Sequence, residues 1–256
     1  MPTDREFDIV IYGASGFTGR LVAEYMVEKD GHGLRWAMAG RSADKLAAVR
    51  AEIGAPADTP IVVADSADPG SLRDMVGSAR CICTTVGPYQ LYGTDVVAAC
   101  TDLGTDYVVL SGEPLWMLDM INTYQDAAAK SGARIVHSCG FDSLPFDLGV
   151  LFLQDAAKAR FGAPCQRVRG RVRDFAGEFS GGTAASLNAT MEAIGRDPSL
   201  VAAITDPFAL AGGFRGPEQP ADCQPYEDEV QGHWVAPFIM ATINTKNVHR
   251  SNALMG

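Results

Sequence analysis

The sequence predicts an α/β protein whose N-terminal part is a doubly wound parallel sheet. Up to about residue 140, short apolar runs alternate with helix-length stretches. The apolar runs are rich in β-branched residues, and glycines follow the helix-length stretches. Strands that alternate with helices are joined by crossover connections and therefore lie parallel, with both faces of the sheet covered.

Six apolar runs are the expected strands, because each is too short for a helix. They cover Phe7–Tyr12, Leu34–Ala39, Ile61–Ala64, Cys81–Val86, Tyr107–Leu110 and Arg134–Ser138. The glycines expected in the left-handed position just past a helix are Gly31, Gly54, Gly77, Gly104 and Gly132. Asp68 before Pro69 marks one helix start, since proline suits the first helical position. Glu113 before Pro114 marks another.

The pattern changes after about residue 143. We therefore expect a first domain over residues 1–143 and a second, α+β domain over residues 144–256. Helical periodicity covers Leu144–Phe161 and Gly181–Ile194, whereas Gln166–Phe175 alternates arginine with apolar residues as a strand with one basic face does. Residues 196–234 contain five prolines and an acidic cluster, which predicts a long loop. Because residues 238–256 read as part of an element, we expect the second domain to be incomplete in this chain.

Composition narrows the class of protein. The 256 residues include 31 acidic and 21 basic side chains, for a net charge of -10. Such a surface repels phosphate backbones, so nucleic acid is not an expected partner. No apolar stretch approaches the roughly 18 residues of a membrane span, and the polar N-terminus does not fit a signal peptide. The six cysteines form no Cys-x-x-Cys pair, which predicts free thiols and no metal site. We expect a cytoplasmic protein.

A glycine-rich turn follows the first expected strand directly. The sequence there is Gly13-Ala-Ser-Gly16-Phe-Thr-Gly19, and a helix is expected from about Phe17. Backbone N–H groups at such a helix N-terminus bind the pyrophosphate of a dinucleotide when no side chain blocks the approach. The turn predicts a Rossmann-type domain. The expected dinucleotide contacts are Gly13, Ala14, Ser15, Gly16, Phe17, Thr18 and Gly19; a purely structural glycine turn is the alternative.

The end of the second expected strand indicates which dinucleotide is bound. An NAD site usually has an acidic residue there, whereas this sequence has Arg41 and Ser42, with Lys45 one turn further on. Arg41 can pair with a 2′-phosphate, and Ser42 can add a hydroxyl, which favours NADP(H). Alternatively, Arg41 only caps a surface loop.

The ends of the third and fourth expected strands supply further cofactor contacts. Asp65 closes the third strand and is expected near the adenine, or else caps the next helix. Val86, Gly87 and Pro88 close the fourth strand. In a doubly wound sheet this position borders the crevice that receives the ribose and nicotinamide.

Proton donors for a reaction are expected at the carboxyl ends of the later strands. Tyr89, Tyr92 and Asp142 are the candidate catalytic residues, because a phenol or a carboxyl can donate to a developing oxyanion. Each tyrosine can instead be a packed aromatic, and Asp142 can hold a turn. Ser111 and Glu113 could reach the same crevice, although Glu113 can equally be the first-turn acid of the next helix.

Two other patterns carry less weight. Tyr25 and Lys29 match the Y-x-x-x-K pair of short-chain dehydrogenases, but they lie on the first helix, far from the nicotinamide end of the crevice. The basic run from Arg167 to Arg173 could face an anionic substrate, or it could be a solvated strand edge that discourages pairing.

The motifs taken together resemble the saccharopine dehydrogenase-like oxidoreductase family, especially its bacterial branch of trans-acting enoyl reductases. They are Gly13–Gly19, Ala39–Arg41, Val86-Gly-Pro-Tyr-Gln-Leu-Tyr-Gly93, Ser111-Gly-Glu113, Ser138-Cys-Gly-Phe-Asp-Ser-Leu-Pro-Phe-Asp147 and Gly181-Gly-Thr183. The resemblance covers nearly the whole chain, and members of the family are usually longer.

The resemblance implies an NADP(H)-dependent oxidoreductase that reduces a C=C or C=N bond. The implied substrate is a lipid-like enoyl or acyl group, either a small molecule or one linked to an acyl carrier. The second domain would serve substrate binding and dimerisation, with a homodimer as the candidate assembly. The alternatives are a non-catalytic NADP-binding sensor or regulator, and a scaffold with an empty Rossmann fold.

Overall fold

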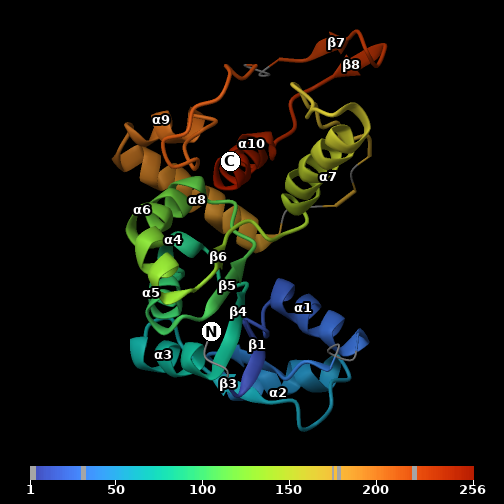
Figure 1. Ribbon diagram of the computed structural model, residues 1–256. Coiled ribbons are helices and arrows are strands. Elements are labelled where there is room, and N and C mark those ends of the chain that lie inside the picture. The colour runs from blue at the N-terminus through green and yellow to red at the C-terminus, as the bar shows by residue number, and fades with distance from the viewer. Residues whose placement is uncertain (1–3, 30–32, 175, 178–179, 221–223) are drawn as a thin grey trace. The chain divides into compact units, whose positions relative to one another are not determined.

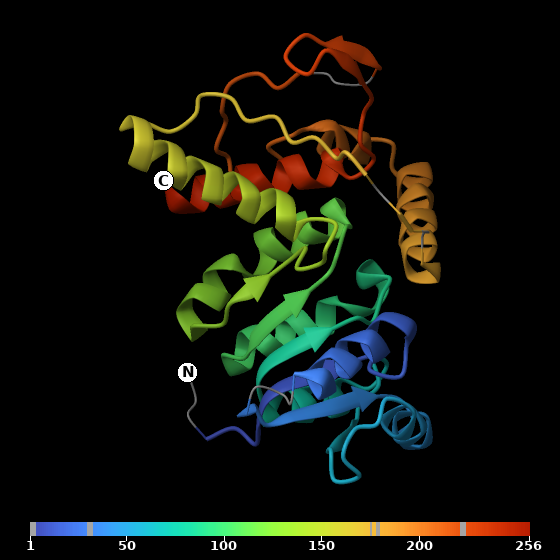
Figure 2. The same ribbon diagram turned by 90° about the vertical axis from the view of Figure 1, so that its right-hand side faces the viewer.

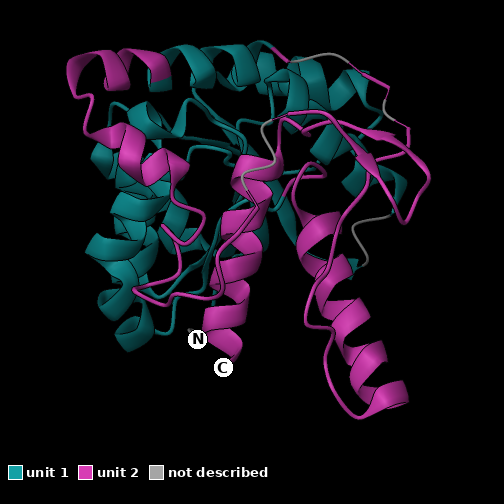
Figure 3. Ribbon diagram, turned by 90° about the horizontal axis from the view of Figure 1, so that it is seen from above, with its two compact units in different colours: residues 1–139, 181–190 teal, residues 140–180, 191–256 magenta. Residues whose placement is uncertain are grey.

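The chain forms two compact units in the computed structural model, which describes residues 4–29, 33–174, 176–177, 180–220 and 224–256. The first unit comprises residues 1–139 and 181–190, and the second comprises residues 140–180 and 191–256 (Figure 3). Helix α8, Gly181–Arg196, therefore contributes residues to both units. These compact units are not the same as independently folding domains. The expected domain boundary at residue 143 therefore stays a prediction.

A six-stranded parallel sheet forms the centre of the first unit (Figure 1). Its strands are β1 (Phe7–Tyr12), β2 (Trp36–Gly40), β3 (Ile61–Val63), β4 (Ala79–Thr84), β5 (Asp106–Val109) and β6 (Ile135–Val136). They lie in the order β3-β2-β1-β4-β5-β6, and every neighbouring pair is parallel. This order confirms the predicted Rossmann-type sheet. The order reverses between β1 and β4, so the crevice typical of this fold opens at the carboxyl ends of these two strands.

Helices cover both faces of the sheet, as predicted. They are α1 (Phe17–Glu28), α2 (Ala43–Glu52), α3 (Pro69–Ser78), α4 (Tyr89–Tyr92), α5 (Thr94–Leu103) and α6 (Pro114–Ser131). Helices α1 and α2 lie on one face, and α3, α5 and α6 lie on the other (Figures 1 and 2). On the first face, Ile11 and Met38 from the sheet pack with Ala23 of α1 and Leu46 of α2, and all four are fully buried.

The glycines predicted to end helices behave in three ways. Gly104 and Gly132 follow α5 and α6 with φ of 68° and 82°, which confirms their left-handed role. Gly54 has φ of 69°, two residues past the end of α2. The prediction for Gly77 is wrong, because α3 continues through it to Ser78 and the chain then passes straight into β4. Gly31 lies outside the described residues.

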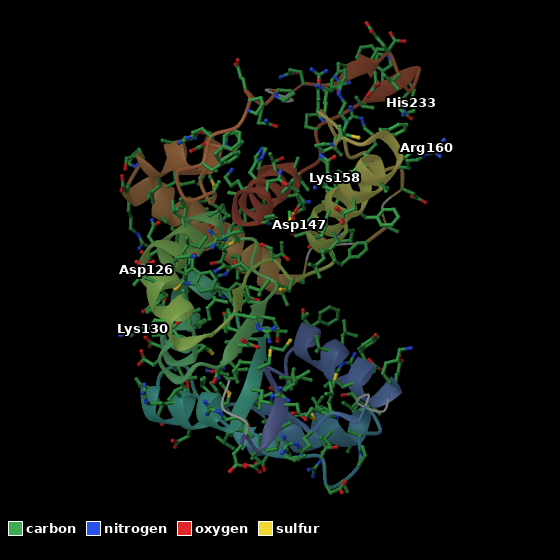
Figure 4. The ribbon with its side chains drawn as sticks, in the orientation of Figure 1. Asp126, Lys130, Asp147, Lys158, Arg160 and His233 are labelled. Atoms are coloured by element: carbon green, nitrogen blue, oxygen red, sulfur yellow. The ribbon has the colours of Figure 1, made fainter. Side chains whose placement is uncertain are left out.

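The second unit is built mainly from helices. It contains α7 (Leu144–Phe161), α9 (Leu200–Thr205), α10 (Ala241–Met255) and the antiparallel strands β7 (Tyr226–Asp228) and β8 (His233–Val235). Figure 4 labels Asp147 in the first turn of α7 and Lys158 and Arg160 in its last turn, where these charges complement the helix dipole. Asp147 also accepts a hydrogen bond from Ser251 of α10 at 2.9 Å. None of the described helices is both long enough and apolar enough to cross a membrane.

Two expectations for the second unit are wrong. Residues 166–174 form no strand, and Phe175 lies outside the described residues. Arg171 turns toward β7 instead, where its guanidinium donates to the buried Asp228 carboxylate at 2.7 Å and to the Tyr226 hydroxyl at 2.6 Å. The arginine spacing therefore reflects at least one specific ion pair and not a sheet. Residues 196–234 are not one long loop, since they contain α9, β7 and most of β8.

Candidate functional site

The glycine-rich turn joins β1 to α1 and is tied to β2 through its backbone. The N–H groups of Gly13 and Ala14 both donate to the Ala39 carbonyl, at 2.9 and 3.1 Å. Gly13 has φ of 94°, a conformation that glycine adopts without steric cost. Its carbonyl accepts a hydrogen bond from Gly16 and lies so close to Gly19 that any Cβ there would overlap it. Glycine is therefore required at positions 13 and 19 by the shape of the turn itself.

The N-terminus of α1 is free of a side-chain cap. Gly16 occupies the N-cap position without a capping hydrogen bond, and the first turn carries no acidic residue. The first N–H groups of an α-helix have no partner within the helix and carry the positive end of its dipole. Gly16 and Phe17 are exposed to solvent. The turn thus presents unpaired amides at an exposed positive end, and it fits a pyrophosphate.

A pocket of about 500 Å³ adjoins this turn. It is lined by Ser15, Gly16, Arg41, Ser42, Lys45 and Asp65. Within the described part of the chain, neither Arg41 nor Lys45 has an ion-pair partner, although most other arginines of the first unit pair with a carboxylate. Two unpaired cations beside an open helix N-terminus favour an anionic ligand in a protein that is otherwise strongly acidic.

Ser42 and Asp65 line this pocket just after the ends of β2 and β3. Ser42 is the N-cap of α2, where its Oγ accepts from the Lys45 amide at 3.3 Å while its hydroxyl hydrogen stays available to a ligand. The cap of α3 is Asp68, which accepts from Gly70 at 3.0 Å. Asp65 therefore does not cap that helix, and its contact with adenine stays a prediction.

The segment that follows β4 packs against the glycine-rich turn. The hydroxyl of Thr85 donates to the Gly13 carbonyl at 3.4 Å. A Cβ at Gly13 would lie 2.7 Å from Thr85 Oγ1 and 2.9 Å from Val86 Cγ2, so the two segments are in direct contact. The cis peptide Gly87–Pro88 and helix α4 come next in the chain. Val86, Gly87 and Pro88 thus border the reversal point between β1 and β4.

Glu113 connects this segment to two other parts of the first unit. Its buried carboxylate accepts from the backbone N–H groups of Tyr89 at 3.0 Å and Gln90 at 2.9 Å. The hydroxyl of Ser186 on α8 donates to the same carboxylate at 2.6 Å. Glu113 occupies the N-cap position of α6 but makes no capping hydrogen bond there, so the alternative that it caps this helix is wrong.

Comparison with known proteins places this geometry in a family. The family model described as the saccharopine dehydrogenase NADP-binding domain matches residues 9–136, which include all six strands of the sheet except the first two residues of β1. The chain belongs to this family. The predicted resemblance is confirmed, and NADP(H) is the cofactor of the saccharopine dehydrogenase-type domain in the first unit.

Three mycobacterial proteins are similar over 99% of this chain. One from Mycobacterium tuberculosis is 45% identical over 263 residues. Proteins named trans-acting enoyl reductase, from Mycobacterium tuberculosis and Mycobacterium leprae, are 40% identical over 265 and 267 residues. The chain spans 62 to 63% of the length of these relatives.

Two solved structures are also similar to the chain. The apo saccharopine dehydrogenase (L-Glu forming) of Saccharomyces cerevisiae matches with a TM-score of 0.44 and 16% identity, over 60% of this chain and 32% of that protein. The triphenylmethane reductase of Citrobacter sp. complexed with NADP(H) matches with a TM-score of 0.40 and 16% identity, over 59% of this chain and 56% of that protein.

The candidate catalytic residues of this saccharopine dehydrogenase-type chain fall into different environments. Tyr89 is buried against Trp116, with ring centroids 5.7 Å apart, and burial together with the nearby Glu113 charge raises the pKa of its phenol. Tyr92, at the other end of α4, is 43% exposed. Asp142 belongs to the second unit, where it is exposed and its carbonyl accepts from Asn244 of α10 at 2.8 Å.

Sequence reasoning missed the contribution of α8 to the first unit. Residues 181–190 group with the sheet, and Ser186 and Thr190 hydrogen-bond Glu113 and Gln90 respectively, the second at 3.5 Å. The available signal was the spacing of these two hydroxyl residues, which places them on one face of a helix. In the described residues, no group of three His, Cys, Asp or Glu side chains is arranged to hold a metal ion.

Proposed function

We propose that this protein is an NADP(H)-dependent oxidoreductase that reduces a C=C or C=N bond. The observation that carries the proposal is the pocket at the N-terminus of α1, where Arg41 and Lys45 have no carboxylate partner among the described residues. A charge-assisted bond to a 2′-phosphate would satisfy Arg41, and the amides of the glycine-rich turn would bind the pyrophosphate.

The cofactor supplies a hydride, and the residues of the chain bind, orient and protonate. Binding of the two phosphate groups at α1 and at Arg41 fixes one half of the dinucleotide. The segment from Val86 to Pro88 lies against the glycine-rich turn, so it is the first part of the chain that the other half would meet. Helix α4 follows this segment and carries the candidate donors Tyr89 and Tyr92.

We further propose that the reduced substrate is a lipid-like enoyl group. Support comes from the two mycobacterial relatives that are named trans-acting enoyl reductase and are 40% identical over nearly the whole chain. The substrate could be presented as a small molecule or on an acyl carrier. Reduction of an enoyl thioester needs a proton at the carbon next to the carbonyl, and a phenol or a carboxyl such as that of Asp142 can provide it.

The test is NADPH oxidation, followed by absorbance, with the purified protein and a panel of substrates. The panel contains enoyl thioesters of increasing chain length on coenzyme A and on an acyl carrier protein, together with imines formed from amino acids. We expect oxidation with the enoyl thioesters. Oxidation with the imines alone would retain the oxidoreductase but overturn the lipid substrate.

The alternative function is a sensor that binds NADP(H) without turnover. The buried position of Tyr89 against Trp116 is the observation that favours it, because a packed aromatic does not reach a substrate. Quenching of protein fluorescence by NADPH, combined with no oxidation across the whole panel, would establish the sensor. Absence of NADPH binding would contradict both functions.

A further inference from the structure

The first turn of α6 holds the short helix α4 at both of its ends. At the N-terminal end, the Glu113 carboxylate accepts from the amides of Tyr89 and Gln90. At the C-terminal end, Trp116 packs against Gly93 so closely that a Cβ there would lie 2.6 Å from the indole ring. A helix of four residues cannot sustain itself, because helix nucleation is unfavourable. The position of α4 therefore depends on these contacts.

We infer that Glu113 is a positioning residue for the reaction. Its carboxylate fixes the position of α4 and of the preceding Val86–Pro88 segment at the nicotinamide end of the crevice. The inference rests on the proposed function. Both carboxylate oxygens are used, since Oε1 accepts from Tyr89 and Ser186 while Oε2 accepts from Gln90. The two backbone amides need two acceptor oxygens. Among side chains of this size, only a carboxylate provides them.

The same carboxylate brings α8 into the arrangement. Ser186 donates to Glu113, and one turn later Thr190 accepts from the side chain of Gln90 at 3.5 Å. Residues 181–190 are thus attached to α4 in two ways: indirectly, through the hydrogen bond from Ser186 to Glu113, and directly, through the hydrogen bond between Gln90 and Thr190. A change at Glu113 would release both α4 and this segment, whereas loss of the Ser186 hydroxyl would leave the two backbone amides bound.

The test is Glu113→Gln, which keeps the size of the side chain. The amide nitrogen of glutamine would face one of the two backbone N–H groups, a contact between two donors. The matched control is Asp106→Asn, which changes another buried carboxylate of the first unit, at the opposite end of β5, where Asp106 pairs with Arg134. Both variants are measured for thermal unfolding, NADPH affinity, kcat and KM.

We expect Glu113→Gln to lower kcat about tenfold to a hundredfold, because small displacements in an active site have effects of that size. The dissociation constant for NADPH should stay within about threefold, since the phosphate contacts lie elsewhere. Asp106→Asn should lower the unfolding temperature and leave kcat unchanged. A Glu113→Gln protein that loses stability like the control but retains its kcat would overturn the inference.

Two further measurements keep the inference open to refutation. If Glu113→Gln does not fold, Glu113→Asp carries the test, because its shorter side chain keeps the carboxylate but cannot reach both backbone amides. We expect kcat to fall about threefold at constant NADPH affinity; an unchanged kcat contradicts the inference. If the wild-type protein reduces no substrate, the proposed function fails separately. The emission of bound NADPH then reports on the nicotinamide environment, and identical emission from wild type and Glu113→Gln would also overturn the inference.

Discussion

The carbonyl of Gly13 occupies the space that a side chain at Gly19 would need. The third glycine of the turn is therefore a requirement of folding. Gly16 differs, because a Cβ there would lie 3.3 Å from the same carbonyl and the residue is exposed. Its φ of -86° is open to any residue. Gly19 is thus required by the packing of α1 on the turn, whereas the close approach of a pyrophosphate is the role predicted for Gly16.

Gly16→Val is expected to remove NADPH binding while the fold is retained. The branched side chain would project from the N-cap of α1 into the space where the pyrophosphate binds. We expect the NADPH dissociation constant to rise at least about tenfold, and the free energy of unfolding to change by less than about 1 kcal/mol. Fluorescence titration and urea unfolding measure the two quantities. Unchanged NADPH affinity would remove the basis of the proposed cofactor site.

Gly19→Ala is the comparison, because it should damage the fold first. Its Cβ meets backbone that cannot move without disturbing the turn, and overpacking of this kind costs about 1–3 kcal/mol. Gly77→Ala is the control, since its Cβ would have only ordinary contacts, the nearest at 3.7 Å. Thermal unfolding of the two proteins should differ clearly; equal stability would contradict the close approach of Gly13 and Gly19.

Arg41→Asp is expected to weaken NADPH binding relative to NADH. Loss of a charge-assisted bond to the 2′-phosphate should cost at least about 1 kcal/mol, or about fivefold in the ratio of the two dissociation constants. Arg73→Asp makes the same change in net charge on α3, where Arg73 pairs with Asp102. It should leave the ratio unchanged. An equal shift in both variants would show a general charge effect and no 2′-phosphate contact.

Tyr92→Phe is expected to lower kcat by about a hundredfold if its phenol donates the proton, within the usual range for acid catalysis. Tyr92 is the more exposed of the two phenols on α4. Tyr89→Phe measures the buried candidate in the same way. Tyr25→Phe on α1 is the control, because this exposed residue belongs to the rejected Y-x-x-x-K match. Wild-type kcat in both α4 variants would assign the proton donor elsewhere, with Asp142 as the next candidate.

Asp8 is expected to make stability depend on pH at the acidic end. Hydrogen bonds and the positive charge of Arg35, assisted by Arg80, lower the pKa of Asp8 from 3.8 to about 2 in the folded protein. Because the folded-state pKa is depressed, the contribution is fully present above about pH 4 and is lost as pH falls through about 2. Urea unfolding of wild type and Asp8→Asn at several pH values measures this difference. A difference that does not shrink toward low pH would contradict it.

The elements of the sheet could be predicted because their cause is local. A strand buried on both faces must be apolar throughout. All six expected strands begin within two residues of the observed ones, at the edges of the sheet as well as at its centre. The helix starts at Pro69 and Pro114 could be predicted for the same reason, since proline suits the first helical position. The glycine-rich turn was predictable because its backbone conformation restricts the residue type at each position.

The parts that could not be predicted depend on partners far away in the sequence. Arg171 sits in an alternating pattern typical of a strand, but its conformation is set by Asp228, 57 residues later. Glu113 looks like a residue at the start of a helix, and only the folded chain shows its carboxylate turned toward Tyr89 and Gln90. No periodicity within a short window contains these pairings.

The first unit is built from two separate stretches of the chain, because the ten residues from 181 to 190 join residues 1–139. During synthesis the sheet can pair as soon as residue 136 has left the ribosome, but the hydroxyl of Ser186 reaches Glu113 only after 50 more residues have been made. A recombinant fragment cut at residue 143 would consequently carry a buried carboxylate with one of its donors missing. Expression trials on this protein should extend at least through Thr190.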